Sequence, residues 1–364
     1  MKILLVSQVP PAFELKRLQS EIFPEFQAQA MWLKALRQLG HQVQVFLYTD
    51  PTILPKKLNA QLHQIIGHAL PNIYNKYRLS KNYYYYFFPE NRYKSHSLHQ
   101  TIVKFKPDKI IISGGISDLV GSAISQAHQL NIPIYLLHGV NPQTGATHFE
   151  IDHLQLFDWI ITNDPSHAQK WSNLGAKHAS AVPYAGIDPG IHRRLKLTTQ
   201  EYHQLQSDLV FVGTLFPDRQ ELFCKLLDLN INFKIWGNLP HGTKLKPQLT
   251  AIYQGDAWGK EAVKVYNATK IALNLVPPHM PVGGNMRTFE IPGSGAFQLT
   301  NRCPTSWYIP SKEIVIFNNL NDLKKKISWY LGHNQKRQAI AQTAYTKTHQ
   351  LYTYAQRFKY ILNL

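Results

Sequence analysis

The sequence predicts an α/β protein with two domains, each built on a doubly wound parallel sheet. Short apolar runs typical of buried strands alternate along the chain with segments of helical length and period, which is the pattern of a parallel sheet covered by helices on both faces. The alternation is interrupted once, by a polar and less periodic stretch at residues 186–207, and then begins again. The length of 364 residues also favours two domains over one.

The first half is expected to alternate strand and helix from its start. The apolar run KILLV is followed by the helical period of AQAMWLKALRQL, which Gly40 ends. The remaining runs follow the same order. The predicted elements are strands at 2–6, 42–48, 107–113, 132–138 and 158–164, and helices at 28–39, 119–130 and 166–175, the last with Ser166 as its N-cap.

The second half repeats this pattern after the polar stretch, which we interpret as the interdomain linker. The two halves of the chain share the same order of strands and helices but not their sequence, so both are expected to be Rossmann-like. The predicted elements are strands at 208–214, 232–237, 271–276, 296–301 and 313–318, and helices at 218–229, 260–270, 287–295, 320–333 and 349–364.

The composition limits the classes of partner. Lys and Arg number 39 against 22 Asp and Glu, which gives a formal charge of +17. A nucleic acid, an anionic membrane surface or a phosphorylated ligand would suit this charge, and so would a merely solvated surface. Two cysteines, Cys224 and Cys303, argue against a disulfide framework. No apolar stretch has the length of a spanning helix, so we expect a cytoplasmic protein that could lie peripherally on the inner face of the membrane.

The segment FVGTLFPDR is the first strand-to-helix loop of the second half. Ligands of such sheets bind beyond the carboxyl ends of the strands, where Gly213 would let the backbone approach an anion. Arg219 falls in the first turn of the next helix, where a cation opposes the helix dipole unless an anion lies between them. A surface arginine on an ordinary strand–turn–helix is the alternative.

The segment GGNMRTFEIPGSG carries one arginine and one glutamate among glycines. Asn285 is a plausible helix cap, and Arg287 suits bidentate pairing with phosphate. Glu290 lies three residues further on the same helical face, where its carboxylate could accept hydrogen bonds from the hydroxyls of a ribose. An internal Arg–Glu pair that stabilises a short helix explains the residues equally well.

The second half resembles the donor-binding part of the GT-B glycosyltransferases, especially the CgeB-like, spore-maturation-type group. The segments that carry the resemblance are FVGTLFPDRQELF, FKIWG, VYNATKIALNLV, GGNMRTFEIPGSGAFQLT, KEIVIFNNLNDLKKKISWYL and HQLYTYAQRF. They cover the chain from residue 208 to its end in the expected order, whereas the first half resembles the fold only generically. The resemblance implies two Rossmann-like domains facing across a cleft.

The resemblance also implies that the chain is divided into three parts with different roles. Residues 1–195 would form the N-terminal acceptor domain, and residues 196–345 the C-terminal domain that binds a nucleotide-sugar donor. Residues 346–364 would form a helix that crosses back to the N-terminal domain.

Site residues follow from the resemblance. Glu290 would bind the ribose, and Arg219 and Arg287 would face the diphosphate, with Lys270 as a weaker candidate for the same anion. The backbone at Gly213, Thr214, Gly284 and Asn285 would assist them, and Trp236, Gly237 and Asn238 would lie near the base. Related retaining enzymes carry an earlier glutamate that touches the sugar, but PPHMPVGGN holds no acid. Sugar contacts are therefore expected from the backbone and Asn285.

No D-x-D occurs in the sequence, so a diphosphate would be neutralised by positive side chains and helix N-termini without a metal. We expect no cofactor, the nucleoside diphosphate sugar being a substrate.

The N-terminal domain is expected to hold the acceptor and the base. His138 ends the strand IPIYLLH and is our first candidate, because imidazole titrates near neutral pH. Asp118, after another strand, is the second; a helix N-cap is its alternative role, and also that of Asp164. His148 and Glu150 follow in a predicted acceptor loop. The aromatic run NYYYYFFPENRY at residues 82–93 could form an acceptor platform, a membrane-dipping surface or ordinary core.

The sequence therefore predicts a metal-independent glycosyltransferase, a hexosyltransferase, that moves a sugar from a nucleoside diphosphate sugar to an acceptor hydroxyl in glycan, glycolipid or cell-envelope synthesis. The acceptor could be a glycan, a lipid-linked molecule or a protein, and an anionic membrane could be a partner. The alternative is a basic protein that binds nucleic acid or nucleotide without transferring a sugar. No nucleic-acid-binding motif is present, so no nucleic acid partner is expected.

Overall fold

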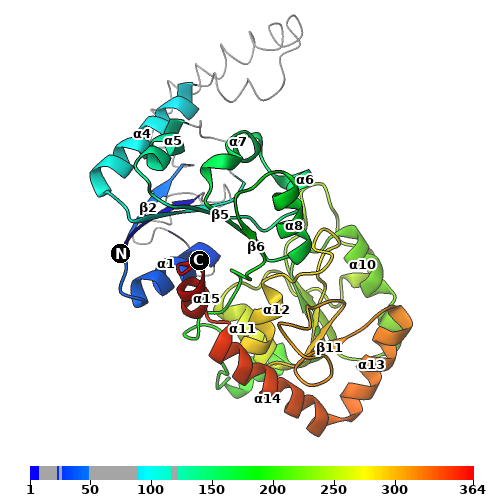
Figure 1. Cartoon of the computed structure of the whole chain (residues 1–364). Helices are drawn as coiled ribbons and strands as arrows, with labels where there is room; N and C mark the ends of the chain where they lie inside the picture. Colours follow the sequence, from blue (N-terminus) through cyan, green and yellow to red (C-terminus); the bar gives the residue numbers. More distant parts are fainter. Residues whose placement is uncertain (8–22, 24–26, 49–88, 116–121) are drawn as a thin grey trace, which may run out of the picture. The chain divides into compact units, whose positions relative to one another are not determined.

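The computed structural model describes residues 1–7, 23, 27–48, 89–115 and 122–364 (Figure 1). The chain divides into two compact units, and each is described by itself. The first unit comprises Met1–Pro24, Trp32–Tyr184 and Leu362–Leu364, and the second comprises Glu25–Met31 and Ala185–Ile361.

The first unit is built on a six-stranded sheet in the order β2-β1-β3-β4-β5-β6, and every pairing is parallel. Its strands are β1 (Lys2–Ser7), β2 (Gln42–Leu47), β3 (Lys109–Ser113), β4 (Ile134–Leu137), β5 (Trp159–Ile161) and β6 (Ala179–Ser180). Its helices are α1 (Ala28–Gln38), whose first residues belong to the second unit, α4 (Pro89–Phe105), α5 (Ser122–Gln129), α6 (Pro142–Gly145), α7 (His148–Asp152), the 3₁₀ helix η2 (Leu154–Leu156) and α8 (Pro165–Asn173).

Helices cover both faces of this sheet, because its strands are apolar on both sides. Alternate strand residues such as Leu4, Val6 and Ile112 form one core with Leu98 of α4 and Ile124 of α5. Figure 1 shows α4 and α5 on the face of the sheet that carries this core and α1 on the opposite face.

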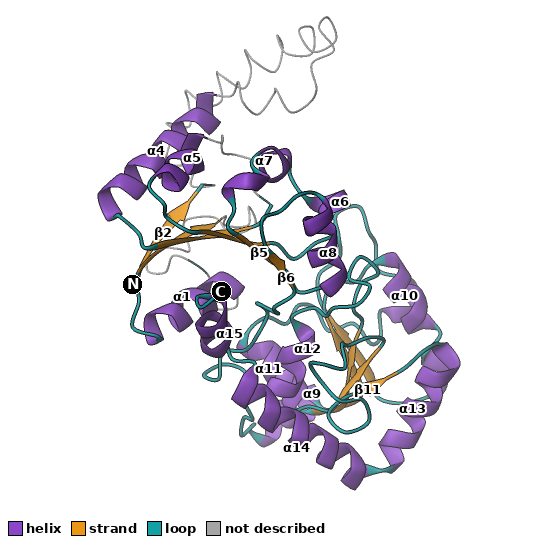
Figure 2. Ribbon diagram, in the orientation of Figure 1, coloured by secondary structure: helices purple, strands orange, loops and turns teal. Residues whose placement is uncertain are grey.

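The second unit repeats the arrangement with five parallel strands in the order β11-β10-β9-β7-β8 (Figure 2). The strands are β7 (Ser207–Val212), β8 (Phe233–Trp236), β9 (Thr269–Asn274), β10 (Gln298–Thr300) and β11 (Val315–Ile316). The helices are α9 (Thr199–Leu205), α10 (Pro217–Cys224), η3 (Leu227–Leu229), η4 (Pro247–Leu249), α11 (Lys260–Asn267), α12 (Arg287–Gly293), α13 (Leu320–Gly332), α14 (Asn334–Leu351) and α15 (Tyr354–Ile361).

Each face of the second sheet has its own core. Leu209 and Phe211 of β7 pack with residues of α10, α13 and α14, whereas Val210 and Val212 pack with residues of α11 and α12. The sheet is therefore doubly wound, as the sequence predicted. The strand order reverses between β7 and β9, which is the place where such sheets bind ligands.

Two predictions about helices are wrong. The presumed linker contains α9, which a capping box between Thr198 and Glu201 starts. The final segment is two helices rather than one, because the chain leaves the helical path after Leu351. There Tyr352 O accepts from Ile187 N at 2.9 Å, and Tyr354 N donates to Ile187 O at 2.9 Å.

Candidate functional site

Arg219 spans the point where the strand order of the second sheet reverses. It lies in the first turn of α10, and its two terminal nitrogens donate to Thr214 O beyond β7 and to Leu275 O beyond β9, both at 2.8 Å. Burial lowers the pKa of Arg219 against the opposite effect of Asp218, and the positive charge of Arg287 adds to the lowering. The guanidinium is therefore fixed at the carboxyl ends of the strands next to a second positive charge.

The neighbouring loops approach each other through their backbones. A Cβ on Gly237 would lie 1.9 Å from Gly213 O, and Gly237 has a φ of +141°, so this position requires glycine. Thr214 Oγ1 donates to Asn238 Oδ1 at 3.2 Å, and Trp236 ends β8 beside them. The structure thus brings together Gly213, Thr214, Arg219, Trp236, Gly237 and Asn238.

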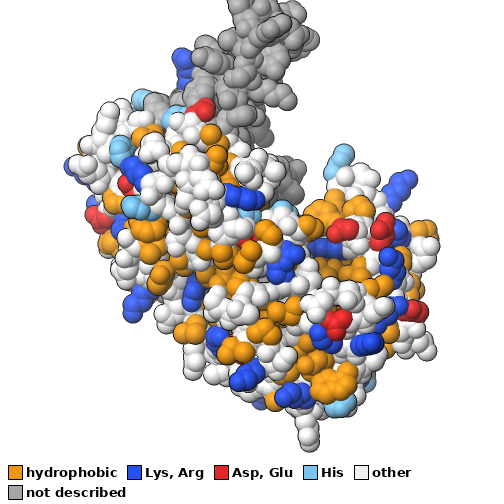
Figure 3. Space-filling view, turned by 45° about the vertical axis from the view of Figure 1, so that its right-hand side comes forward, with side chains coloured by type: hydrophobic (Ala, Val, Ile, Leu, Met, Phe, Trp, Pro, Cys, Tyr) orange, Lys and Arg blue, Asp and Glu red, His pale blue; other side chains and the backbone are white. Residues whose placement is uncertain are grey.

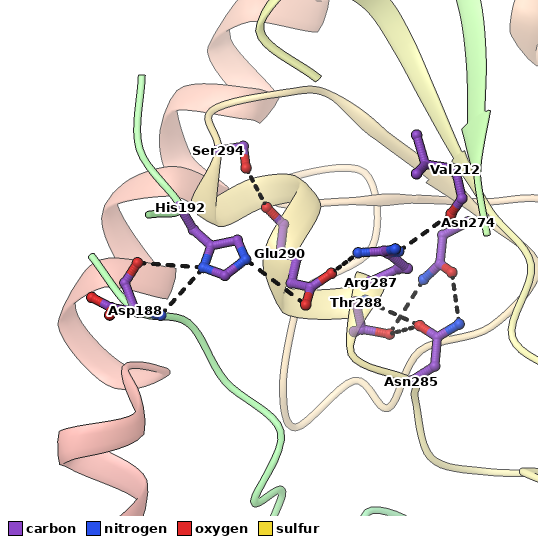
Figure 4. A network of polar contacts seen from close by, with 9 residues as sticks. All are labelled: Asp188, His192, Val212, Asn274, Asn285, Arg287, Thr288, Glu290 and Ser294. Atoms are coloured by element: carbon purple, nitrogen blue, oxygen red, sulfur yellow. Dashed lines mark hydrogen bonds and ion pairs between the residues drawn. The ribbon is translucent and has the colours of Figure 1, made fainter. Parts of the chain in front are cut away.

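The glycine-rich loop before α12 is fixed by three polar side chains (Figure 4). Asn285 Nδ2 donates to Asn274 Oδ1 at 3.0 Å, Asn274 Nδ2 donates to Thr288 Oγ1 at 3.3 Å, and Asn285 Oδ1 accepts from Thr288 N at 3.2 Å. Asn285 therefore acts as the predicted cap. A Cβ on Gly284 would lie 2.6 Å from Thr288 Oγ1, so glycine allows the loop to lie against α12.

Arg287 and Glu290 form the intrahelical ion pair that was the alternative interpretation of this segment. Arg287 Nη1 donates to Glu290 Oε2, and its Nε donates to Val212 O at the end of β7 at 3.2 Å. Burial opposes the charge of Arg287, but Glu290 outweighs this and raises the pKa of the arginine. The side chain of Arg287 remains 22% exposed, so pairing with Glu290 leaves it accessible to a ligand.

A histidine from the segment before α9 completes this network. His192 Nε2 lies 3.8 Å from Glu290 Oε1, and both side chains are buried. The carboxylate is thus held between Arg287 on one oxygen and His192 near the other (Figure 4).

Lys270 does not join these residues. It lies near the amino end of β9, and its Nζ forms an ion pair with Asp208 Oδ1 at 2.8 Å. The ligand-binding edge of the sheet is the opposite one, beyond Asn274. The structure therefore gives no support to Lys270 as a ligand of the anion.

In the first unit, His138 directly follows β4 and is only 1% exposed. Its Nε2 lies 3.3 Å from Glu150 Oε2, and its Nδ1 lies 3.2 Å from Val140 O. Glu150 also accepts from Gly115 N at 2.7 Å and Thr147 N at 2.8 Å. Burial alone would raise the pKa of Glu150, but these hydrogen bonds and His138 lower it below its usual value.

The other predictions for the first half have mixed outcomes. Asp118 and residues 82–88 lie outside the described residues, and residues 89–93 begin α4. Asp164 is the N-cap of α8, with Oδ1 accepting from Ser166 N, so the predicted cap Ser166 is wrong by two positions. His148 begins α7, and the catalytic role of His138 stays a prediction.

Sequence reasoning missed His192, Asn274 and Thr288. Asn274 could have been found, because it ends a predicted strand at the ligand-binding edge of the sheet. His192 gave no signal among 17 histidines, since its position near Glu290 depends on tertiary contacts.

Within the described ranges, no helix is long and apolar enough to cross a membrane. Among the same residues, no group of three or more His, Cys, Asp or Glu side chains is placed to hold a metal ion. Metal independence stays a prediction.

Comparison with known proteins agrees with this geometry. A family model described as "Glycosyl transferase-like" matches residues 219–363. Spore protein CgeB of Bacillus subtilis is 26% identical over an alignment of 242 residues that covers 62% of this chain and 72% of that protein. Among solved structures, Anabaena HepE in complex with UDP and glucose has a TM-score of 0.65 at 13% identity and covers 100% of this chain and 98% of its own. TarM has a TM-score of 0.55 at 14% identity; the match covers 74% of this chain but only 58% of TarM.

The fold is that of the GT-B glycosyltransferases, and the family match over residues 219–363 supports a glycosyltransferase. The chain is similar to spore protein CgeB, in agreement with the resemblance noted for its second half.

Proposed function

We propose that the second unit binds the nucleoside diphosphate of the sugar donor at the carboxyl ends of β7 and β9. The observation that carries this proposal is the position of two guanidinium groups at the carboxyl ends of these strands: Arg219 donates to Thr214 O and Leu275 O, and Arg287, which pairs with Glu290, donates to Val212 O. Within the described part of the chain, Arg219 has only backbone carbonyls as hydrogen-bond partners. A diphosphate would supply the missing negative charge.

Glu290 is proposed to bind the ribose. A carboxylate has about four acceptor positions, and Arg287 and His192 use only part of them. Hydroxyl groups of a ribose would take the rest. The base would lie near Trp236, Gly237 and Asn238, and the backbone at Gly213, Thr214, Gly284 and Asn285 would contact the phosphates and the sugar.

UDP is the proposed nucleotide, because HepE was solved with it and matches the chain over its full length. The acceptor is proposed to bind the first unit, with His138 or Asp118 as the base. A glycan, lipid-linked or protein acceptor of cell-envelope synthesis fits the relation to a spore protein. We place the enzyme in the cytoplasm, acting without a metal and peripherally at the inner face of the membrane.

The charge of +17 does not favour a nucleic acid in this structure. Figure 3 shows Lys and Arg side chains scattered over the visible face among other types. In the basic run of α13, Lys324 pairs with Asp228 and Lys326 with Asp322. A continuous basic band, which nucleic acid binding requires, is not visible on this face.

The proposal is tested by thermal unfolding in the presence of UDP, ADP, GDP and their sugar conjugates. A ligand at 100 times its Kd stabilises the native state by about 2.7 kcal/mol, so UDP should raise the Tm by several degrees. No shift with any of these ligands, together with salt-sensitive binding of an oligonucleotide, would overturn the proposal.

A further inference from the structure

In the described part of the chain, the Glu290 carboxylate forms a charge-pair contact with a side chain from outside its own helix, that of His192. His192 belongs to the segment that leads from Ala185 to α9, and its Nε2 lies 3.8 Å from Glu290 Oε1. In Figure 4 the imidazole reaches the carboxylate from the side opposite Arg287. Both side chains are 4% exposed.

The surroundings of His192 determine which nitrogen carries its proton. Nδ1 lies 3.3 Å from both the backbone nitrogen and the carbonyl oxygen of Asp188. If Nδ1 carried the proton, the lone pair of Nε2 would face the charge of Glu290. The favourable neutral form therefore has its proton on Nε2, while Nδ1 accepts from the Asp188 N–H. Burial and the positive charge of Arg287 lower the pKa of His192, whereas Glu290 and Asp188 raise it. The lowering prevails, so the neutral ring is favoured at neutral pH.

The backbone around His192 is fixed. His192 N donates to Asp188 O at 2.8 Å, and Gly190 N donates to Asp188 Oδ1 at 2.8 Å. A Cβ on Gly293 at the end of α12 would lie 2.7 Å from Ile187 Cγ2 and 3.5 Å from His192 Cβ. The segment thus lies directly against α12, and the imidazole has little freedom to turn away.

We propose that His192 is a positioning residue for the donor site: the Nε2–H group holds the Glu290 carboxylate in the orientation that accepts the ribose hydroxyls. The inference rests on the proposed ribose-binding role of Glu290. His192 acts on the nucleotide through Glu290 and does not need to touch it.

The test compares His192→Phe, which keeps a ring but has no donor, with His192→Gln, whose amide places an N–H near the position of Nε2. Affinities for UDP and for 2′,3′-dideoxy-UDP, which lacks the ribose hydroxyls, are measured by calorimetry. His192→Phe should weaken UDP binding roughly ten-fold and His192→Gln by less than about three-fold, because the N–H group that faces the carboxylate is lost only in the first. Binding of the dideoxy nucleotide should be the same in all three proteins.

A second comparison uses Glu290→Gln as the background. There His192→Phe should cause no further loss of UDP affinity, because the carboxylate that it positions is gone. If His192→Phe does not fold, His192→Asn replaces it, since its amide is too short to reach Glu290.

Three results would overturn the inference. Equal UDP affinity of wild type and His192→Phe removes the role of His192 but leaves the proposed function intact. Equal weakening of UDP and dideoxy-UDP shows that the ring supports the fold and not the carboxylate. Failure of the wild type to bind UDP removes the proposed nucleotide and the inference together.

Discussion

Each unit holds a buried glutamate beside a histidine, but different groups hold the two carboxylates. Glu150 accepts from two backbone N–H groups, those of Gly115 and Thr147, in addition to its contact with His138. Among the described residues, the carboxylate of Glu290 is held only by side chains, those of Arg287 and His192. Backbone donors cannot move without moving the loops, so Glu150 is part of the framework. One of the two side chains that hold Glu290, that of Arg287, is 22% exposed and thus in contact with solvent.

The two carboxylates also differ in the charged groups around them. Glu290 pairs with Arg287, whose charge also acts on Arg219, so the second unit has two guanidinium groups close together, with Asp218 as the acidic neighbour of Arg219. Among the described residues, the ionisable side chain that pairs with Glu150 is that of His138. Two adjacent guanidinium groups at the carboxyl ends of the strands suit an anionic donor, and this pair distinguishes the second unit from the site of Glu150.

The largest expected effect is on the stability of the first unit. Glu150→Gln should lower the free energy of unfolding by about 3 kcal/mol, because one oxygen is replaced by an NH₂ group that faces buried donors. Urea unfolding measures this loss. Glu221→Gln, at a glutamate that is 62% exposed, is the matched control and should change stability by less than about 0.5 kcal/mol. UDP affinity should stay unchanged, and a loss below about 1 kcal/mol would contradict a framework role for Glu150.

The loss of stability in Glu150→Gln should depend on pH. The pKa of Glu150 is lower in the folded protein than its ordinary value of 4.5, so the carboxylate contributes stability above that value and the contribution is lost as the pH falls through the folded-state pKa. The stability difference between wild type and Glu150→Gln should therefore be largest near pH 7 and shrink below about pH 4.5. A difference that stays constant down to pH 3 would show that the charge of Glu150 does not matter.

The next effect concerns binding in the second unit. Arg219→Ala should weaken UDP binding about 30- to 100-fold and leave uridine binding unchanged, because the lost interactions are charged hydrogen bonds to phosphate. Arg337→Ala is the control, since Arg337 is a buried arginine of the same unit that also donates to a backbone carbonyl, that of Tyr330. Calorimetry with UDP and uridine separates the two variants. If Arg219→Ala lost as much affinity for uridine as for UDP, Arg219 would support the loop rather than bind the diphosphate.

The sequence was sufficient for the strands, because buried parallel strands are apolar on both faces and stand out from amphipathic helices. All the sheet strands of the described residues were predicted except β6 (Ala179–Ser180), whose two residues are too short to show a pattern. The short helix α12 was also predicted, since its glycines and its Arg287–Glu290 spacing are local. The capping box that starts α9 is just as local, but it was missed within a polar stretch.

The candidate site was predicted only where its contacts are local or follow strand ends. The pair of Arg287 and Glu290 was found as one of two interpretations, and Arg219 was found from its place after β7. The position of His192 next to Glu290 could not be predicted, because it requires the segment after Ala185 to lie against α12. The same limit applies to the hydrogen bonds that join Asn274, Asn285 and Thr288.

The smallest effect is expected at Lys270, and it tests where the donor site ends. The ion pair of Lys270 with Asp208 is largely exposed on the lysine side, at 54%, and such pairs contribute between zero and about 1 kcal/mol. Lys270→Ala should therefore change stability by less than about 0.5 kcal/mol and leave UDP affinity unchanged, because the residue lies near the amino end of β9. Calorimetry compares the UDP affinities of Lys270→Ala and Arg219→Ala directly. A loss of UDP affinity at Lys270 similar to that at Arg219 would place anion binding at both edges of the sheet, and the carboxyl ends of β7 and β9 would no longer account for the positive charge of the second unit.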